Sequence, residues 1–380
     1  MGKVKIVRTS TVPGSLNTFC RGLLSELQNE GYDVVAVSSP GERLDELSER
    51  EGVRAVAVPM ERHIAPFKDM RSLWRLVKVF KREKPYMVHS ITPKAGLLSM
   101  MAARICGVPV RLHTFTGLVF PTAKGLKQKV LVLTDRLTCA CATHVVPEGE
   151  GVKADLLRYR ITRKPLRVLG HGNIRGIDLE HFNPANEDVR KRAAEIRQDG
   201  VFTFIFIGRL VRDKGINELI KAFLRLHATN RNTRLLLVGT EEPELDPLLP
   251  ETREAIENNK AIEAVGRQDD VRPWLLASDA LVFPSYREGF PNVVIEAGAM
   301  GLPSIVTDIN GSREIIIEGR NGMIVPPRNA ESLHDAMLQF AETPTLVKHL
   351  SLEARELVAT RYEQTYVRDC LKKYYREIMV

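Results

Sequence analysis

The sequence lacks the features of a membrane-spanning, secreted or nucleic-acid-binding protein. No apolar run approaches the ~20 residues that a membrane-spanning helix needs, and the one after Lys3 and Lys5 is too short for a signal peptide. Only 6% of the residues are aromatic, and no stripe of basic and aromatic side chains offers a stacking surface for bases. We therefore expect a cytoplasmic protein that does not bind nucleic acid.

Cysteine is also scarce and shows no framework spacing. The chain has five cysteines, an odd number that favours reduced thiols over a disulfide scaffold. Cys139 and Cys141 form a C-x-C near His144, but no second ligand pair follows at the spacing of a zinc finger. We interpret these cysteines as buried structural thiols and predict no metal site.

Apolar and basic residues are abundant. Of 380 residues 44% are hydrophobic, and 55 lysines and arginines against 47 acids give a net charge of +8. The length exceeds one typical domain of roughly 100–200 residues, so we expect two domains, each with its own core. The excess of cations indicates an anionic partner, and with nucleic acid disfavoured the candidates are a phosphorylated substrate and an anionic membrane surface.

Short apolar runs alternate with helical patterns along the whole chain. Residues 11–31 are expected to form a loop and then a single amphipathic helix. The alternation predicts an α/β fold with two doubly wound parallel sheets, joined within the Gly-rich stretch 169–184. Strands are expected at 3–10, 32–39, 53–60, 87–90 and 110–115, and then at 201–210, 233–239, 261–267, 280–285, 303–308 and 322–327.

The segment IFIGRLVRDKG places two cations just after a strand. Arg209 and Lys214 are five residues apart and flank a short turn that opens a helix. Two cations beside a helix N-terminus can hold a pyrophosphate through charge-assisted hydrogen bonds. The alternative is a solvated turn that happens to be basic, and the segment alone does not decide between them.

The segment YREGFPNVVIEAG places two acids around a strand-to-helix junction. Glu288 lies in the loop, Pro291 suits the first helical turn, and Glu296 falls about one turn inside the helix. Carboxylates at these positions can accept hydrogen bonds from sugar hydroxyls. A lone acid in a helix usually faces solvent, whereas two acids framing Gly-Phe-Pro are a much less ordinary arrangement.

These residues resemble the Glu-x7-Glu motif of the family 4 retaining glycosyltransferases, and GRLVRDKG resembles the phosphate-binding motif of the same family. The resemblance covers the whole chain and is closest to bacterial enzymes of capsule, O-antigen and lipid-linked glycan synthesis. It implies the GT-B fold, in which two doubly wound domains face a central cleft. Residues 1–175 with the C-terminal helix 362–380 would form the acceptor-side domain, and 176–361 the donor-binding domain.

The resemblance also implies a role for each matching residue. Glu288 would hold hydroxyls of the donor sugar and Glu296 those of the ribose, while Arg209 and Lys214 would neutralise the departing diphosphate. No residue is assigned as nucleophile, and same-face attack with retention is adopted from the family. The implied pocket is completed by Gly289, Phe290, Pro291 and Asn292, and by Arg267 against the nucleobase.

Two residues of the first half complete the predicted site. His113 is placed at the end of a strand, where the family often carries a histidine near the reacting sugar carbon; with the other motifs present we favour this over a structural role. Gly14 is placed in the first strand-to-helix loop, where its backbone can approach the donor phosphate. Here Pro13–Gly14 replaces the Gly-Gly pair of many relatives, and Arg175 replaces an amide in the linker.

A D-x-D motif, which holds a divalent metal in the other large glycosyltransferase fold, is absent from the sequence. We therefore expect a metal-independent enzyme without a cofactor, in which cationic side chains and helix amides act on the leaving group.

The segment 69–85 combines an apolar face, including Leu73 and Trp74, with five surrounding cations, including Arg71 and Arg75. Such a helix can lie on an anionic membrane surface, which would make the protein peripheral on the inner face of the cell membrane. The alternative is a helix that packs on the sheet and extends its charges into solvent.

The sequence thus predicts transfer of a sugar from a nucleotide-diphosphate sugar to a lipid-linked or oligosaccharide acceptor. UDP-hexose and UDP-N-acetylhexosamine are the expected donors. Two other functions are left open, a UDP-N-acetylglucosamine 2-epimerase of the same fold and a non-catalytic scaffold at the membrane. An epimer formed without acceptor would indicate the first, and failure to bind nucleotide the second.

Overall fold

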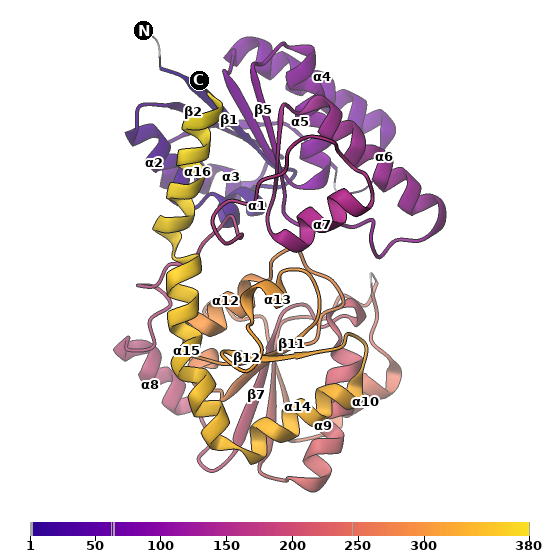
Figure 1. Cartoon of the computed structure of the whole chain (residues 1–380), viewed down its shortest axis with the longest axis vertical. Coiled ribbons are helices and arrows are strands. Elements are labelled where there is room, and N and C mark those ends of the chain that lie inside the picture. Colours follow the sequence, from indigo (N-terminus) through magenta and orange to yellow (C-terminus); the bar gives the residue numbers. More distant parts are fainter. Residues whose placement is uncertain (1–2, 62, 64, 245, 380) are drawn as a thin grey trace. The chain divides into compact units, whose positions relative to one another are not determined.

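The computed structural model describes residues 3–61, 63, 65–244 and 246–379. The chain divides into two compact units, Met1–Gly176 with Thr365–Val380, and Ile177–Gln364 (Figure 1). Each unit contains a six-stranded sheet in which every strand pair is parallel. The units are described one at a time below.

The first sheet has the order β3-β2-β1-β4-β5-β6. The direction of winding reverses between β1 and β4, which are hydrogen-bonded neighbours with Ile6 opposite Met87. This is a topological switch point, where the loops at the carboxyl ends of two adjacent strands diverge. The strands are β1 (Lys5–Thr9), β2 (Asp33–Ser38), β3 (Arg54–Ala57), β4 (Met87–Ile91), β5 (Val110–Phe115) and β6 (His144–Pro147).

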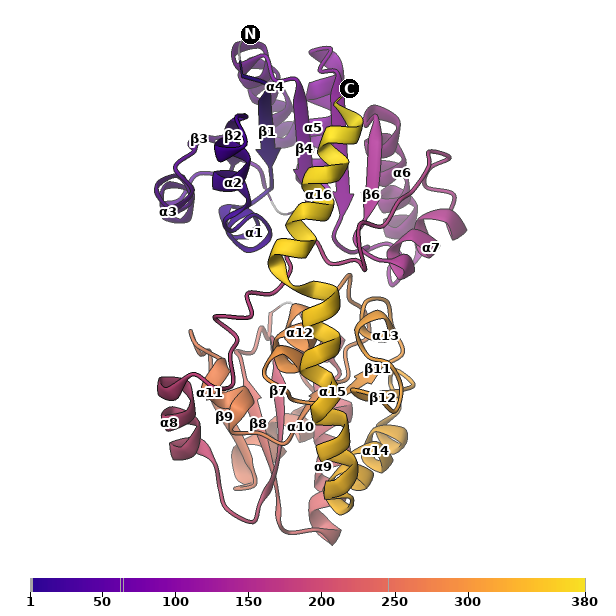
Figure 2. The ribbon, with the colours of Figure 1, turned by 60° about the vertical axis from the view of Figure 1, so that its left-hand side comes forward.

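Helices cover both faces of the first sheet, because successive strand residues point to opposite sides. Val7 and Val35 pack with one group of helices, α4 to α6, whereas Ile6 and Val34 pack with α2 and the C-terminal helix. Figure 2 shows the C-terminal helix α16, in yellow, crossing the second of these faces. The helices are α1 (Pro13–Phe19), α2 (Leu23–Asn29), α3 (Glu42–Glu51), α4 (Pro66–Glu83), α5 (Pro93–Ile105), α6 (Gly125–Cys141), α7 (Glu150–Arg158) and α16 (Gln364–Ile378).

The second sheet has the order β12-β11-β10-β7-β8-β9, the same winding as the first when its strands are numbered from β7. Its switch point lies between β7 and β10, which pair with Ala280 opposite Phe204. The strands are β7 (Phe202–Ile207), β8 (Thr233–Val238), β9 (Ile262–Gly266), β10 (Ala280–Phe283), β11 (Ser304–Thr307) and β12 (Gly322–Val325).

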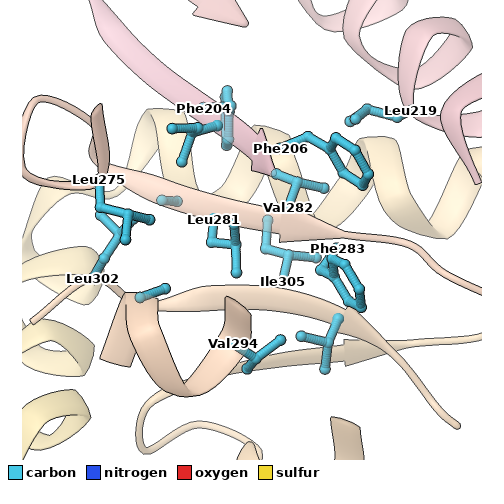
Figure 3. Close-up of a cluster of buried hydrophobic side chains, with 14 of the residues drawn as sticks. Phe204, Phe206, Leu219, Leu275, Leu281, Val282, Phe283, Val294, Leu302 and Ile305 are labelled. Atoms are coloured by element: carbon cyan, nitrogen blue, oxygen red, sulfur yellow. The ribbon is translucent and has the colours of Figure 1, made fainter. Parts of the chain in front are cut away.

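The core of the second unit is built mainly from apolar side chains. Phe204 and Phe206 of β7 and Leu281 and Phe283 of β10 are buried and lie near one another in Figure 3. Central strands of a parallel sheet are covered on both faces, which is why these segments read as continuous apolar runs. The surrounding helices are α8 (Glu187–Ile196), α9 (Ile216–Thr229), α10 (Pro250–Asn258), α11 (Arg272–Leu276), α12 (Asn292–Ala299), α13 (Ser312–Ile315), α14 (Ala330–Glu342) and α15 (Pro344–Tyr362).

Two local expectations were wrong. Residues 11–31 form two helices, α1 and α2. Gly22, between them, adopts a left-handed conformation with φ of 74° and interrupts the helical path of the backbone. The expectation that Gly14 lies in a loop is also wrong, since α1 begins at Pro13, where a missing N–H costs no hydrogen bond. A sixth strand, β6, was not anticipated.

The structure adds two observations that bear on disulfide-bonded and membrane-spanning classes of protein. All five cysteines are free thiols. Cys20, directly after α1, and Cys139 and Cys141, at the end of α6, are buried. Among the described residues, none of the helices is long and apolar enough to cross a membrane.

Candidate functional site

Most of the predicted site residues lie at the switch point of the second sheet. Lys214 is in a short 3-10 turn, η1 (Arg212–Lys214), between β7 and α9, and Glu288 is in the loop between β10 and α12. Because β7 and β10 are neighbours, their loops leave the sheet side by side and then run in opposite directions. Ligands of open α/β sheets bind in the crevice that this divergence creates.

Lys214 and Glu288 form an ion pair between these two loops. The Lys214 ammonium contacts Glu288 Oε1, and both side chains are 18% exposed, so the pair remains open to solvent on one side. The same Glu288 oxygen accepts a hydrogen bond from Ser285 Oγ at 2.9 Å. Lys214 also lies 5.2 Å from the centre of the Phe283 ring, within cation–π range. These three contacts therefore fix the carboxylate and the ammonium.

Backbone contact between the loops requires glycine at one position. Gly215 has a φ of 73°, and a Cβ there would lie 2.1 Å from the carbonyl oxygen of Pro284. Any other residue would force the start of α9 away from the loop after β10. The hydrogen bond from Tyr286 N–H to Asp213 O, at 2.9 Å, holds the same two loops together.

Arg209 follows β7 but points to a different partner. Its guanidinium donates to Glu242 Oε2 at 2.6 Å, and Glu242 lies in the loop after β8. The Arg209 side chain is 52% exposed, and exposed ion pairs of this kind contribute little stability. Arg209 is therefore held weakly and is available to another anion.

The Gly-Phe-Pro loop offers its backbone and hides its aromatic ring. Phe290 is buried, with its ring 5.5 Å from that of Tyr362 in an edge-on arrangement. Gly311, in the loop after β11, has a φ of 74°, and a Cβ there would lie 2.5 Å from the carbonyl oxygen of Gly289. Gly311 thus packs closely against the Gly-Phe-Pro loop. Because the Phe290 ring is buried, the groups that this loop can offer to a ligand are main-chain amides.

The remaining predicted residues of the second unit lie near the same edge of the sheet. Pro291 is buried and immediately precedes α12, Asn292 is the first residue of that helix, and Glu296 lies one turn further in, half-buried. Arg267 follows β9, at the far strand of the sheet, with a side chain 69% exposed. Its guanidinium contact, at 3.9 Å, is with Asp269.

His113 belongs to the first unit and is held firmly in its core. It lies within β5, two residues before the end of the strand, and is buried. Its Nδ1 is 2.8 Å from Ser90 Oγ, its ring is 4.5 Å from that of Phe115, and Gly96 of α5 packs against it, where a Cβ would lie 2.4 Å from Cε1. Burial lowers the pKa of His113 to about 3, so the imidazole is neutral at physiological pH.

Gly14 also belongs to the first unit, as the second residue of α1. A Cβ at this position would meet only Arg43, with NH1 at 3.4 Å. The structure thus gives no steric reason for glycine at residue 14 within the protein itself.

Several residues of the site were missed from the sequence. Glu242 and Gly311 contact predicted residues across strands that are far apart in the chain, so no local spacing could reveal them, whereas Ser285 lies only three residues before Glu288 in the same loop. Their common signal is position, since each follows a strand at the carboxyl edge of the sheet. Among the residues that the structure describes, no group of three His, Cys, Asp or Glu side chains is placed to hold a metal ion.

Two family models match the chain. Residues 201–343 match the family described as glycosyl transferases group 1, and residues 14–172 match the glycosyl transferase 4-like domain. The first match spans β7 to α14 and so includes the Lys214–Glu288 pair.

Individual relatives match over the whole length. The chain is 30% identical over 380 residues to the capsular polysaccharide biosynthesis glycosyltransferase CapM of Staphylococcus aureus, covering 100% of this chain and 98% of that protein. It is 28% identical over 389 residues to the UDP-Gal:alpha-D-GlcNAc-diphosphoundecaprenol alpha-1,3-galactosyltransferase of Escherichia coli, with the same coverage of 100% and 98%.

A solved structure shares the fold. Anabaena Alr3699/HepE, in complex with UDP and glucose, has a TM-score of 0.83 at 15% identity, covering 98% of this chain and 100% of that one. The predicted fold, two doubly wound parallel sheets of the GT-B class, is confirmed.

Proposed function

The chain belongs to the group 1 glycosyltransferases, and from this premise we propose that it transfers a sugar from a nucleotide-diphosphate sugar to a lipid-linked glycan acceptor, with retention of configuration. The observation that carries the proposal is the Lys214–Glu288 ion pair at the β7–β10 switch point. It presents a cation for phosphate and an acceptor for hydroxyl groups at the edge where this fold binds ligands.

The site must stabilise the nucleoside diphosphate as it departs. Negative charge grows on the bridging phosphate oxygen as the glycosidic bond breaks, and preorganised cations stabilise it. Lys214 is fixed by Glu288 and Phe283, and Arg209 is free to exchange Glu242 for a phosphate oxygen. The amides of Phe290 and Asn292, at the start of α12, would add backbone donors for the same anion.

The two carboxylates would orient the donor. Glu288 Oε1 is occupied by Ser285 and Lys214, so Glu288 enters the reaction as a fixed acceptor for sugar hydroxyls. Glu296, one turn into α12, would hold the ribose hydroxyls, and exposed Arg267 would pack on the base. Gly14 would approach the phosphates from the first unit. Neither acid is proposed as the nucleophile.

His113 would act as a neutral hydrogen-bonding group near the reacting sugar. With a pKa of about 3 it carries no charge at neutral pH and is poorly suited to give up a proton. Its fixed ring, held by Ser90 and Gly96, suits positioning.

A uridine nucleotide and a hexose or N-acetylhexosamine are the proposed donor components. One relative is a galactosyltransferase whose name includes UDP-Gal, and Alr3699/HepE, which shares the fold, was solved in complex with UDP and glucose. The diphosphoundecaprenol acceptor of that relative supports a lipid-linked acceptor here. We further propose that the transfer needs no metal, so a chelator should leave the rate unchanged.

A panel of UDP-, GDP- and ADP-sugars in a thermal unfolding assay tests donor binding, because a ligand that binds the native state raises the midpoint. A rise of several degrees with one nucleotide class is expected, and no rise with any of them would contradict the proposal. Product analysis by NMR then distinguishes sugar transfer from the competing epimerase activity. A sugar epimer formed without acceptor would contradict the proposal and indicate an epimerase.

A further inference from the structure

A cavity of about 340 Å³ opens between two helices of the second unit, α9 and α14. The two helices pack side by side (Figure 1), α9 following β7 and α14 following β12. The walls of the cavity are Lys221, Ala222 and Arg225 of α9, and residues 328–331 at the start of α14. None of these residues takes part in the Lys214–Glu288 ion pair, so the cavity is separate from the site described above.

Three cations line this cavity. Lys221 and Arg225 are one helical turn apart on α9, and Arg328 belongs to the loop before α14. Among the residues that the structure describes, neither Lys221 nor Arg328 forms an ion pair. Arg225 lies 3.8 Å from Glu331, and because these side chains are 59% and 76% exposed the pair is weak. The cavity therefore carries a net positive charge.

Arg328 is held in an unusual backbone conformation. Its φ of 61° lies in the left-handed region, which glycine or asparagine normally occupies. Pro326 and Pro327 precede it and stiffen the loop. Its guanidinium lies over the ring of Tyr286, 4.6 Å from the ring centre and within cation–π range. Such strained residues persist where the surrounding structure fixes them, and they are concentrated at ligand sites.

Stacking on a ring uses the face of a guanidinium and leaves its edge available. The N–H groups lie in the plane of the group, where they can bind two oxygens of one phosphate. The amides at the start of α14 are occupied instead, because Asn329 Oδ1 accepts hydrogen bonds from Glu331 N–H at 3.1 Å and Ser332 N–H at 3.0 Å. The cavity thus offers an anion three cationic side chains, and not helix amides.

Tyr286 connects this cavity to the predicted donor site. It lies in the loop between β10 and α12, two residues before Glu288. Its N–H donates to Asp213 O at 2.9 Å, and its hydroxyl donates to Glu218 Oε2 of α9 at 2.6 Å. A ligand that fixes Arg328 would therefore also fix the ring of Tyr286 and the loop that carries Glu288.

We propose that the cavity between α9 and α14 is a second anion site, which binds a small phosphate-bearing metabolite and thereby strengthens nucleotide binding at the donor site. Its volume falls within the range of small-molecule sites, about 300–1,000 Å³. Cations that converge on a cavity favour a small ligand over an extended polyanion. The binding of the anion is independent of the proposed function, whereas its effect on the nucleotide rests on that function.

Calorimetric titration of pyrophosphate into the full chain tests the anion site, with UDP present at saturation to occupy the donor site. One pyrophosphate per chain is expected. Lys221→Gln/Arg225→Gln should raise the Kd at least about tenfold, because charge-assisted contacts with phosphate are lost. The control Arg190→Gln/Lys191→Gln removes the same charge from exposed positions of α8 and should leave the Kd unchanged.

Arg328→Gly gives a second test that does not depend on a change in folding. Glycine adopts the backbone conformation of residue 328 freely, so this variant should be as stable as the wild type or nearly so. It nevertheless loses the guanidinium and should raise the Kd for pyrophosphate at least about fivefold.

Titration of UDP with and without pyrophosphate tests the effect on the donor site. Pyrophosphate also competes with UDP at Lys214, but this competition is the same in the wild type and in Lys221→Gln/Arg225→Gln. At one fixed pyrophosphate concentration the apparent Kd for UDP should therefore be about fivefold lower in the wild type than in the variant. Without pyrophosphate the two values should agree.

The proposal is overturned if pyrophosphate does not bind, if the variants of the cavity bind it as the wild type does, or if the α8 control weakens it equally. Equal apparent Kd values for UDP in the presence of pyrophosphate would also overturn it. If UDP does not bind the wild type at all, while pyrophosphate binds and the cavity variants weaken it, the proposed function and the link to the donor site fail and the anion site stands.

Discussion

The two sheets have the same strand order but hold different groups at their switch points. In the second unit, the loops after β7 and β10 bring together a partly exposed ammonium and carboxylate, Lys214 and Glu288. In the first unit, the loops after β1 and β4 meet through two hydroxyls, Thr11 Oγ1 and Thr92 Oγ1, at 2.9 Å.

Beneath the first switch point lies a buried polar network. Arg8 of β1 contacts His89 of β4 and donates to Tyr375 of α16 at 2.6 Å, with Cys20 Sγ at 3.1 Å. Arg8, His89 and Tyr375 are almost completely buried, so no ligand reaches them from solvent. The comparison shows that topology indicates where a site can lie, whereas the exposure and partners of the charged groups indicate whether that edge can serve a ligand.

The largest effect is expected from breaking the ion pair of the second unit. Glu288→Ala should lower the rate of sugar transfer by at least about a hundredfold, because the sugar hydroxyls lose a fixed acceptor. The thermal midpoint should change little, since the pair is partly exposed. Glu242→Ala, which removes the acid paired with Arg209 at the same edge, is the control and should retain most activity. Near-normal turnover by Glu288→Ala would remove that residue from the site.

A second effect should come from the loop that supports the site. Gly311 and Gly319 have nearly the same φ, 74° and 73°, but a Cβ at Gly311 meets the segment 289–291 whereas one at Gly319 meets nothing within 4 Å. Gly319→Ala should cost about 1 kcal/mol in stability, and Gly311→Ala about 3 kcal/mol with loss of transfer. Thermal unfolding and activity assays on both variants measure the difference. Equal losses would mean that the contact with Gly289 is unimportant.

The network of the first unit should act on stability and leave the chemistry intact. Tyr375→Phe removes a hydroxyl that lies 2.6 Å from Arg8 and 2.5 Å from His89, which leaves a buried cation short of a partner. The expected loss is about 2 kcal/mol, while the folded fraction should transfer sugar normally. Tyr374→Phe, at the neighbouring position, is the control. A Tyr375→Phe protein of normal stability but low activity would reverse the comparison.

A smaller, pH-dependent effect is expected at Asp135 of α6. Burial raises its pKa from 3.8 to about 7, so between these values the native state binds more protons than the unfolded state. Stability from this group therefore falls as the pH rises from about 4 to about 7 and is constant above that range. Asp135→Asn should match the wild type near the lower limit and exceed it by about 1–2 kcal/mol above the upper one. Urea unfolding midpoints at both ends measure this, and a difference that does not vary with pH would contradict it.

The fold was predictable because its signals are local and repeated. Continuous apolar runs such as that before Gly208 mark central parallel strands, and the helices between them fix the winding. The break at Gly22 and the short strand at 144–147 were missed, since one glycine conformation and four residues carry too little pattern.

The site was predictable only in part. Lys214 and Glu288 stand out because each follows a strand in a distinctive motif. The contact between Lys214 and Glu288, and the packing of Gly311 against the loop that follows Glu288, depend on which strands are adjacent, whereas Ser285 lies only three residues before Glu288. The sequence likewise gave no sign that Asp135 is partly buried or that the α6 leucines are exposed, because both depend on how one helix is rotated against the sheet.

The central claim is that the donor diphosphate binds at Lys214, at the β7–β10 edge of the second unit. Calorimetric titration of UDP and of uridine into the wild type and Lys214→Met tests it most directly. The Kd for UDP should rise at least about tenfold in the variant, the loss expected for one charge-assisted contact, while the Kd for uridine should stay the same. An unchanged Kd for UDP, or an equal rise for both ligands, would contradict the account.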